Sequence, residues 1–263
     1  MAIESVLLNV TDISRSVKFY TRFLRAKVVG EPTEDHAVLD VVNAIIDLKR
    51  IDGAQASTWE ADDLQKGFRH VGFKVARVGP LADELKAAGV RFHLEPLNAE
   101  GGVRITFFFD PDGTLLELVE GDLQYHRIVD ERGVAAERAL GVPDRPRFDH
   151  VALTVDDFAV TQGFYRTFGF GHIGTINQPN DPRGFCINYL KCGDTVLEVF
   201  TYEADKRGRT PQFDATGFVS ARLTASPAVE HGVLVNKAAD GSSVYADADG
   251  FAYSVVDWGD ELA

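Results

Sequence analysis

The sequence is short of the features that mark secreted and membrane proteins. Its 263 residues include two cysteines, Cys186 and Cys192, which are too few for a disulfide framework. They flank an expected hairpin, so a disulfide between them stays open, but we expect two buried thiols. No apolar run approaches the roughly 18 residues that a membrane helix needs, and no secretory leader precedes the first strand. These absences favour a cytoplasmic protein without membrane contact.

Clusters of positive charge are missing as well. Lysine and arginine total 27 against 40 aspartates and glutamates, which gives a formal net charge of -13. An acidic chain without a basic patch is a poor partner for nucleic acid or for an anionic membrane. The 45% hydrophobic content is nevertheless enough for a real core, in one large domain or in two of ordinary size. The composition therefore indicates a globular protein.

A strand, a helix and three further strands recur four times along the chain. The opening strands alternate in hydrophobicity and begin at Ile3, Phe68, Phe148 and Phe218. The helices begin at or near Asp12, Pro80, Asp157 and Pro227. The repeat is plainest between residues 10–20 and 155–165, where the apolar and aromatic positions have equal spacing. This pattern predicts an α+β fold of four βαβββ modules.

The chain divides into two halves with two modules each. Residues 123–147 break the pattern with charged residues, two prolines and a short expected helix around Val134 to Leu140. We interpret this segment as a connection. Residues 1–122 are then the N-terminal domain, and residues 148–263 are the C-terminal domain.

Two histidines and two glutamates stand out in the central modules. His70 lies in the first strand of module two and Glu117 in its last strand, and His150 and Glu198 occupy the same places in module three. Side chains on a strand alternate between faces, so each histidine points away from the residues that pack on a helix and into whatever the sheet encloses. A carboxylate among apolar neighbours is costly to bury unless it is paired or binds a cation. We therefore predict that these four residues form one metal site.

The alternative is that these residues are structural. A single histidine on a strand is more often a core or surface residue than a ligand, and a single strand glutamate is usually solvated. The recurrence of both residue types at equivalent positions favours metal binding. The remaining histidines have no placement that indicates a role, namely His36, His93, His126, His172 and His231. The run Phe107-Phe108-Phe109 is expected to pack in the core, and the alternative is that Phe108 or a neighbour lines the enclosed cavity.

Several stretches resemble the vicinal oxygen chelate superfamily, which includes glyoxalase I, extradiol dioxygenases, methylmalonyl-CoA epimerase, and fosfomycin and bleomycin resistance proteins. The stretches are Ile3 to Leu24, Phe148 to Phe170, the His70 strand, and Asp110-Pro111-Asp112-Gly113 followed by Leu116-Glu117-Leu118-Val119. The resemblance covers nearly the whole chain. It implies that the modules pair into two cup-shaped half-barrels, with metal ligands on the first and last strands of each module.

The same resemblance gives each module one pair of ligand positions. In module order, the pairs are Ser5 with Asp47, His70 with Glu117, His150 with Glu198, and Phe218 with Ser254. In fused members of the family, modules two and three can share one cup while modules one and four share the other. The resemblance therefore implies one complete site and an outer cup with an incomplete ligand set, in which Asp47 is expected to face solvent or a loop.

Two imidazoles and two carboxylates suit one divalent ion, with zinc, nickel, cobalt, manganese and iron all open. The ion would act as a Lewis acid on a small-molecule substrate, and Glu117 or Glu198 would move a proton. The resemblance favours a glyoxalase I-like lyase or isomerase. The alternatives are an extradiol ring-cleaving dioxygenase, in which Ser5 and Phe218 would replace expected histidines, and a protein that sequesters a ligand without turnover. Four modules in one chain are compatible with either a monomer or a homodimer.

Overall fold

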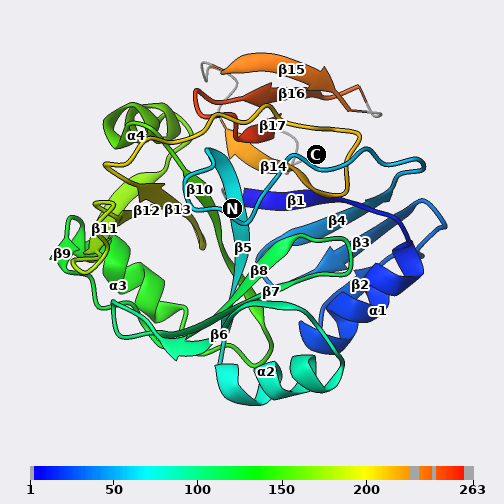
Figure 1. The fold of residues 1–263 in the computed structure, drawn as a ribbon, viewed down its shortest axis with the longest axis horizontal. Coiled ribbons are helices and arrows are strands. Elements are labelled where there is room, and N and C mark those ends of the chain that lie inside the picture. Colours follow the sequence, from blue (N-terminus) through cyan, green and yellow to red (C-terminus); the bar gives the residue numbers. More distant parts are fainter. Residues whose placement is uncertain (1–2, 226–230, 239–240, 258–263) are drawn as a thin grey trace.

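The computed structural model describes residues 3–225, 231–238 and 241–257, which form two large sheets and four helices (Figure 1). In chain order the elements are β1 (Ile3–Val10), α1 (Ile13–Phe23), β2 (Lys27–Val29), β3 (His36–Asp40), β4 (Ile45–Arg50), β5 (Gly67–Val75), α2 (Val78–Ala87), β6 (Phe92–Asn98), β7 (Arg104–Phe109), β8 (Leu115–Glu120), β9 (Arg127–Ile128), α3 (Glu131–Ala139), β10 (Arg147–Thr154), α4 (Phe158–Arg166), β11 (Gly171–Asn177), β12 (Cys186–Cys192), β13 (Thr195–Thr201), β14 (Gly217–Ala225), β15 (Val233–Lys237), β16 (Ser243–Ala246) and β17 (Ala252–Asp257). This is the mixed α+β architecture that the repeat predicts. No helix in these ranges is long and apolar enough to cross a membrane.

The two sheets pair the modules in the way that the resemblance implies. The eight-stranded sheet has the order β15-β16-β17-β14-β1-β4-β3-β2, and the nine-stranded sheet has the order β6-β7-β8-β5-β10-β13-β12-β11-β9. Modules one and four meet where β1 pairs antiparallel with β14, and modules two and three meet where β5 pairs antiparallel with β10. Both halves of the chain therefore contribute strands to both sheets. The division into domains on either side of residues 123–147 stays a prediction.

Three of the four described helices begin where an aspartate satisfies free backbone N–H groups, whereas α2 begins after Arg77 without a side-chain cap. Asp12 accepts a hydrogen bond from the N–H of Arg15 at 2.9 Å at the start of α1, and Asp157 accepts one from the N–H of Ala159 at 2.7 Å at the start of α4. These contacts confirm the expected N-cap at Asp12 and the helix start expected near Asp157. The buried face of α1 packs against β3 and β4, which fixes the helix on one side of the eight-stranded sheet.

A tyrosine from each of two helices bonds to an aspartate in a turn of another module. The Tyr20 hydroxyl on α1 donates to Asp110 Oδ2, and the Tyr165 hydroxyl on α4 donates to Asp247 Oδ2, both at 2.8 Å. Burial raises the pKa of Asp110 to about 6 and that of Asp247 to about 6, although their hydrogen bonds oppose the shift. Each pair joins a module of one sheet to a module of the other, so the two bonds tie the sheets together.

The expectation of a hairpin between the cysteines is wrong. Cys186 and Cys192 lie at opposite ends of the single extended strand β12, and both are free thiols. Seven extended residues hold their Cα atoms far beyond the 4.4–6.8 Å that a disulfide spans. An intramolecular disulfide is therefore excluded, and the expectation of two thiols is confirmed, although both are only partly buried.

The sequence pattern misses the weakest strands. It does not indicate β2, β9 or β11, because β2 and β9 are short and consist of exposed residues and β11 contains two glycines. The helices expected near Pro80 and around Val134 are present as α2 and α3. The helix expected near Pro227 lies outside the described residues.

Candidate metal centre

The four candidate ligands lie on four adjacent strands at the centre of the nine-stranded sheet, in the order β8, β5, β10 and β13. In the same order, the candidate ligands are Glu117, His70, His150 and Glu198. The parallel pairings place Glu117 beside Gly72 and Glu198 beside Ala152. The antiparallel pairing of β5 with β10 then places Gly72 opposite His150 and Ala152 opposite His70. The register of the three pairings therefore brings the four residues together.

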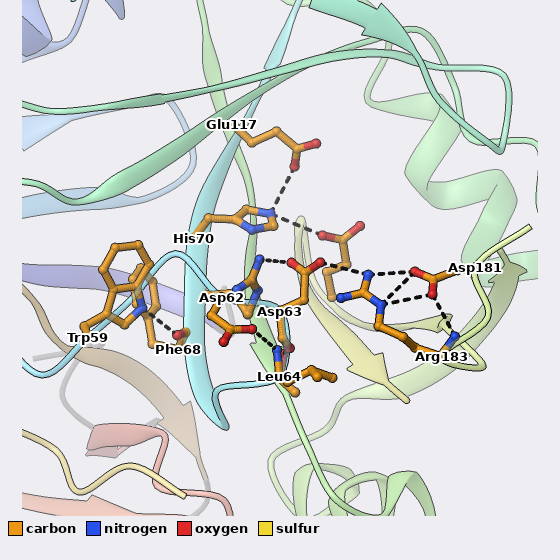
Figure 2. Close-up of polar contacts among 12 residues, drawn as sticks. Trp59, Asp62, Asp63, Leu64, Phe68, His70, Glu117, Asp181 and Arg183 are labelled. Carbon is orange, nitrogen blue, oxygen red and sulfur yellow. Dashed lines mark hydrogen bonds and ion pairs between the residues drawn. The ribbon is translucent and has the colours of Figure 1, made fainter. Parts of the chain in front are cut away.

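The spacing of the donor atoms fits a single ion. One donor from each residue lies within 4.8 Å of all the others. His70 Nε2 is 3.1 Å from Glu117 Oε2 and 3.3 Å from Glu198 Oε2. His150 Nε2 is 2.9 Å and 3.3 Å from the same two oxygens, and the two Nε2 atoms are 3.0 Å apart. Ligands at roughly 2.1 Å from an ion are about 3.0 to 3.4 Å from their neighbours in octahedral or tetrahedral geometry. Figure 2 shows the His70 ring directed at Glu117.

The cluster is buried and incompletely hydrogen-bonded. All four side chains are largely shielded from solvent, with the Glu117 side chain 6% and the Glu198 side chain 9% exposed. Glu117 Oε2 lies close to both imidazoles but has no partner with hydrogen-bond geometry among the described residues. His70 Nδ1 is also buried without a hydrogen-bond partner among them. Buried carboxylates without donors are unfavourable by several kcal/mol. A cation among these atoms would remove that cost.

The two imidazoles differ in their affinity for a proton. Burial lowers the pKa of His70 to about 4, although Glu117 opposes the shift. Burial also disfavours a charged His150, but the negative charges of Glu198 and Glu117 and the hydrogen bond with Asp149 outweigh it and raise the pKa of His150 well above its usual value. His70 therefore presents a neutral nitrogen, whereas His150 holds a proton that a metal ion would displace.

Asp149 orients His150 and was not indicated by the sequence. Its Oδ2 lies 2.9 Å from His150 Nδ1, which leaves Nε2 to face the cluster. Strict alternation would direct Asp149 to the opposite face of β10 from His150. The ladder between β10 and β5 shifts register between Phe148 and His150, and such an irregularity can re-aim a side chain. Tyr189 on β12 pairs directly with Glu198 on β13, so these two residues are cross-strand neighbours.

Gly72 provides the space that the His150 ring occupies. A Cβ built on Gly72 would lie 2.0 Å from His150 Cε1 and 2.3 Å from His150 Nε2. The backbone at Gly72 has no positive φ, so the requirement for glycine comes from the ring alone. The sequence places Gly72 on the same face as His70 but gives no sign of this contact.

A cavity of about 540 Å³ opens beside the cluster. Glu117, His150 and Glu198 line it together with Asp149 and Arg69. Much of the remaining wall is apolar and comes from Leu94, Leu97, Val103, Ile105, Phe107, Leu115, Val119, Leu123, Phe185, Ile187 and Phe200. Phe107 contacts the His70 ring with their centroids 4.8 Å apart, whereas Phe108 is fully buried in the core. In this run of phenylalanines, a neighbour of Phe108 therefore lines the cavity. His93, for which the sequence indicated no role, also lines it.

The outer cup has a different character. Asp47 lies on β4 with its side chain about one third exposed, and it contacts His36 Nε2 at 2.7 Å. Phe218 stacks on Phe68 with ring centroids 3.9 Å apart. Ser5 lies on β1 and Ser254 on β17. Within the part of the chain that the structure describes, the central four residues are the one group of this kind that could hold a metal ion.

Comparison with known proteins agrees with this fold. Residues 2–118 and 147–261 match the Glyoxalase/Bleomycin resistance protein/Dioxygenase superfamily. A probable lactoylglutathione lyase of Vibrio cholerae is 29% identical over 126 residues, which cover 43% of this chain and 86% of that protein. A probable chloroplastic lactoylglutathione lyase of Arabidopsis thaliana is 31% identical over 125 residues, which cover 44% of this chain and 34% of that protein.

Two solved structures share the architecture along almost the whole chain. Glyoxalase I from Zea mays aligns over 99% of this chain and 94% of its own, with a TM-score of 0.64 and 21% identity. A putative dioxygenase from Bacillus subtilis aligns over 98% of this chain and 85% of its own, with a TM-score of 0.65 and 15% identity. The repeated modules, the pairing of the sheets and the match to both halves lead to one conclusion: the chain belongs to the Glyoxalase/Bleomycin resistance protein/Dioxygenase superfamily.

Proposed function

We propose that the protein is a metal-dependent enzyme that converts a small oxygenated substrate in the central cavity, with a glyoxalase I-type isomerase or lyase reaction. The single observation that carries this proposal is the convergence of His70, Glu117, His150 and Glu198 within 4.8 Å of one another beside that cavity. Two imidazoles and two carboxylates suit zinc, nickel, cobalt, manganese or ferrous iron. When bound, such an ion supplies Lewis-acid polarisation of adjacent substrate oxygens.

The side chains in and around the cluster would orient the ligands and transfer the proton. Asp149 fixes the tautomer and orientation of the His150 ring. Glu117 Oε2 is buried and has no hydrogen-bond partner of good geometry among the described residues, and neither oxygen of Glu198 is in that state. Glu117 is therefore the carboxylate assigned to proton transfer, in which its Oε2 takes a proton from a substrate carbon and returns it to the neighbouring carbon. The apolar walls of the cavity exclude water from this exchange.

The relatives support the choice of reaction. The proteins from Vibrio cholerae and Arabidopsis thaliana are described as probable lactoylglutathione lyases. They align with less than half of this chain, so the activity is transferred here as a proposal.

Metal analysis and one activity assay test the proposal. The purified protein is expected to contain about one divalent ion per chain and to lose turnover of a hemithioacetal on chelation, with recovery when metal is restored. His70→Ala and His150→Ala should each abolish metal retention, since a buried ligand is lost, and Ser254→Ala in the outer cup serves as the matched control. Equal metal content in all three variants, or turnover that chelation leaves unchanged, would contradict the proposal.

A ring-cleaving dioxygenase is the second candidate. His70, His150 and one glutamate would make the facial triad that non-haem ferrous enzymes use, and the apolar walls of the cavity suit an aromatic ring. Oxygen uptake with a catechol that depends on ferrous ion, together with no turnover of the hemithioacetal, would reverse the order of the two candidates.

A further inference from the structure

One arginine lines the central cavity. Arg69 precedes His70 on β5 and is only 4% exposed. The pairing of β5 with β10 shifts register at Arg69, which lets this side chain reach the cavity although its strand neighbour His70 points into the adjoining cluster. Among the described residues of the cavity wall, Arg69 is the one arginine or lysine. It therefore determines where an anionic group can be tolerated there.

The guanidinium of Arg69 is only partly satisfied. Its Nη2 donates to Asp63 Oδ1, but its Nε and Nη1 are buried and have no hydrogen-bond partner among the described residues. The Phe200 ring, 5.7 Å from Cζ, covers the group without accepting a conventional hydrogen bond. Each buried N–H without an acceptor is unfavourable, and more so on a charged group. An oxygen of a bound molecule would supply the missing acceptor.

Asp63 accepts hydrogen bonds from two arginines, Arg69 and Arg183. The second carboxylate oxygen, Oδ2, accepts a hydrogen bond from Arg183 Nη2 at 3.1 Å, and Arg183 is bound in turn to Asp181 (Figure 2). One carboxylate thus faces two guanidinium groups. Arg69 is anchored through one nitrogen, and its charge remains available to a second anion.

The other residues that line the cavity restrict the kind of molecule that could carry an anionic group to Arg69. Besides Asp63, four carboxylates line the cavity and repel negative charge, namely Glu100, Glu117, Asp149 and Glu198, so an anionic group is directed to Arg69. Other parts of the lining, including Leu97, Ile105 and Leu115, offer only apolar contact. We propose that Arg69 forms a carboxylate subsite beside the metal cluster and that the substrate is an apolar molecule bearing one carboxylate. This inference deepens the proposed function and rests on it for the position of the reacting oxygens.

Binding of a matched pair of probes to the metal-stripped full-length protein tests the subsite. The probes are 3-phenylpropanoate and its neutral isostere 3-phenylpropanamide, each titrated by calorimetry. The wild type is expected to bind the acid at least about tenfold more tightly than the amide, because a charge-assisted hydrogen bond is made only with the acid. Arg69→Gln should abolish this preference. The matched control Arg183→Gln removes the other guanidinium from Asp63 and should retain it, since Arg183 does not line the cavity.

Two further measurements keep the outcome unambiguous. Thermal unfolding and cobalt titration should show that Arg69→Gln folds and binds metal like the wild type. If that variant does not fold, Arg69→Lys replaces it and is expected to retain a weakened preference for the acid. Equal binding of acid and amide by the wild type, or an undiminished preference in a folded Arg69→Gln, would overturn the subsite. A preference for the acid in a wild type that binds no metal would overturn the proposed function but leave the subsite standing.

Discussion

A methyl group at position 72 would test whether the His150 ring must lie where the structure places it. A Cβ on Gly72 would lie 2.0 Å from His150 Cε1. Carbon atoms in contact are normally about 3.5 Å apart, so the ring has to retreat by roughly 1.5 Å or the two strands have to separate. Metal ligands tolerate about 0.2 Å of error in distance, so a retreat of this size removes His150 from the cluster.

Two quantities should therefore change in Gly72→Ala. Metal affinity in a competition titration should fall at least about 100-fold, because a first ligand is displaced. The free energy of unfolding in urea should fall by about 1 to 3 kcal/mol to the extent that the strands separate instead. Gly79→Ala on α2 is the matched control, since a Cβ there meets nothing within 4 Å, and it should leave metal binding unchanged. A Gly72→Ala protein with both wild-type stability and wild-type metal affinity would refute the reasoning.

Three further predictions concern the contacts around the cluster and between the sheets. Asp149→Asn should lower metal affinity about 10- to 100-fold in the same titration, because the charge that orients His150 is lost, and an unchanged affinity would make the contact incidental. Tyr20→Phe should lower the free energy of unfolding by about 1 to 3 kcal/mol in urea, since Asp110 loses a buried donor, and an unchanged midpoint would contradict this. With a folded-state pKa of about 6 against an ordinary value of 3.8, Asp110 makes the folded chain bind more protons than the unfolded chain between these pH values. Its contribution to stability should fall by up to about 3 kcal/mol as pH rises from about 4 to about 6, so Asp110→Asn should gain stability relative to the wild type over that window, and a pH-independent difference would contradict the shifted pKa.

The candidate ligands could be found from the sequence because three regularities agree. Alternation along a strand directs His70 and His150 to one face, the repeat places Glu117 and Glu198 at matching positions, and a buried carboxylate needs a partner. The proximity of the four could not be derived from these patterns. It depends on the antiparallel pairing of β5 with β10, which joins strands about 80 residues apart and leaves no local signal.

The residues that the sequence did not indicate share a physical cause. Asp149 reaches His150 through an irregularity in β10, and Arg69 reaches the cavity through one in β5, although alternation would direct it away from His70. Gly72 looks like any strand glycine until the His150 ring is seen to fill the space above it. Departures from ideal strand geometry and contacts between remote strands leave no periodic trace in a sequence.

The position of the cluster at the join between β5 and β10 gives a bound ion a second role. Two of its ligands come from the first half of the chain and two from the second. An ion bound by all four ligands would link the two halves of the chain, and its binding free energy would oppose their separation. Loss of the ion would then weaken the contact between β5 and β10, so the protein's resistance to heat and proteolysis would report the fraction of chains that hold an ion.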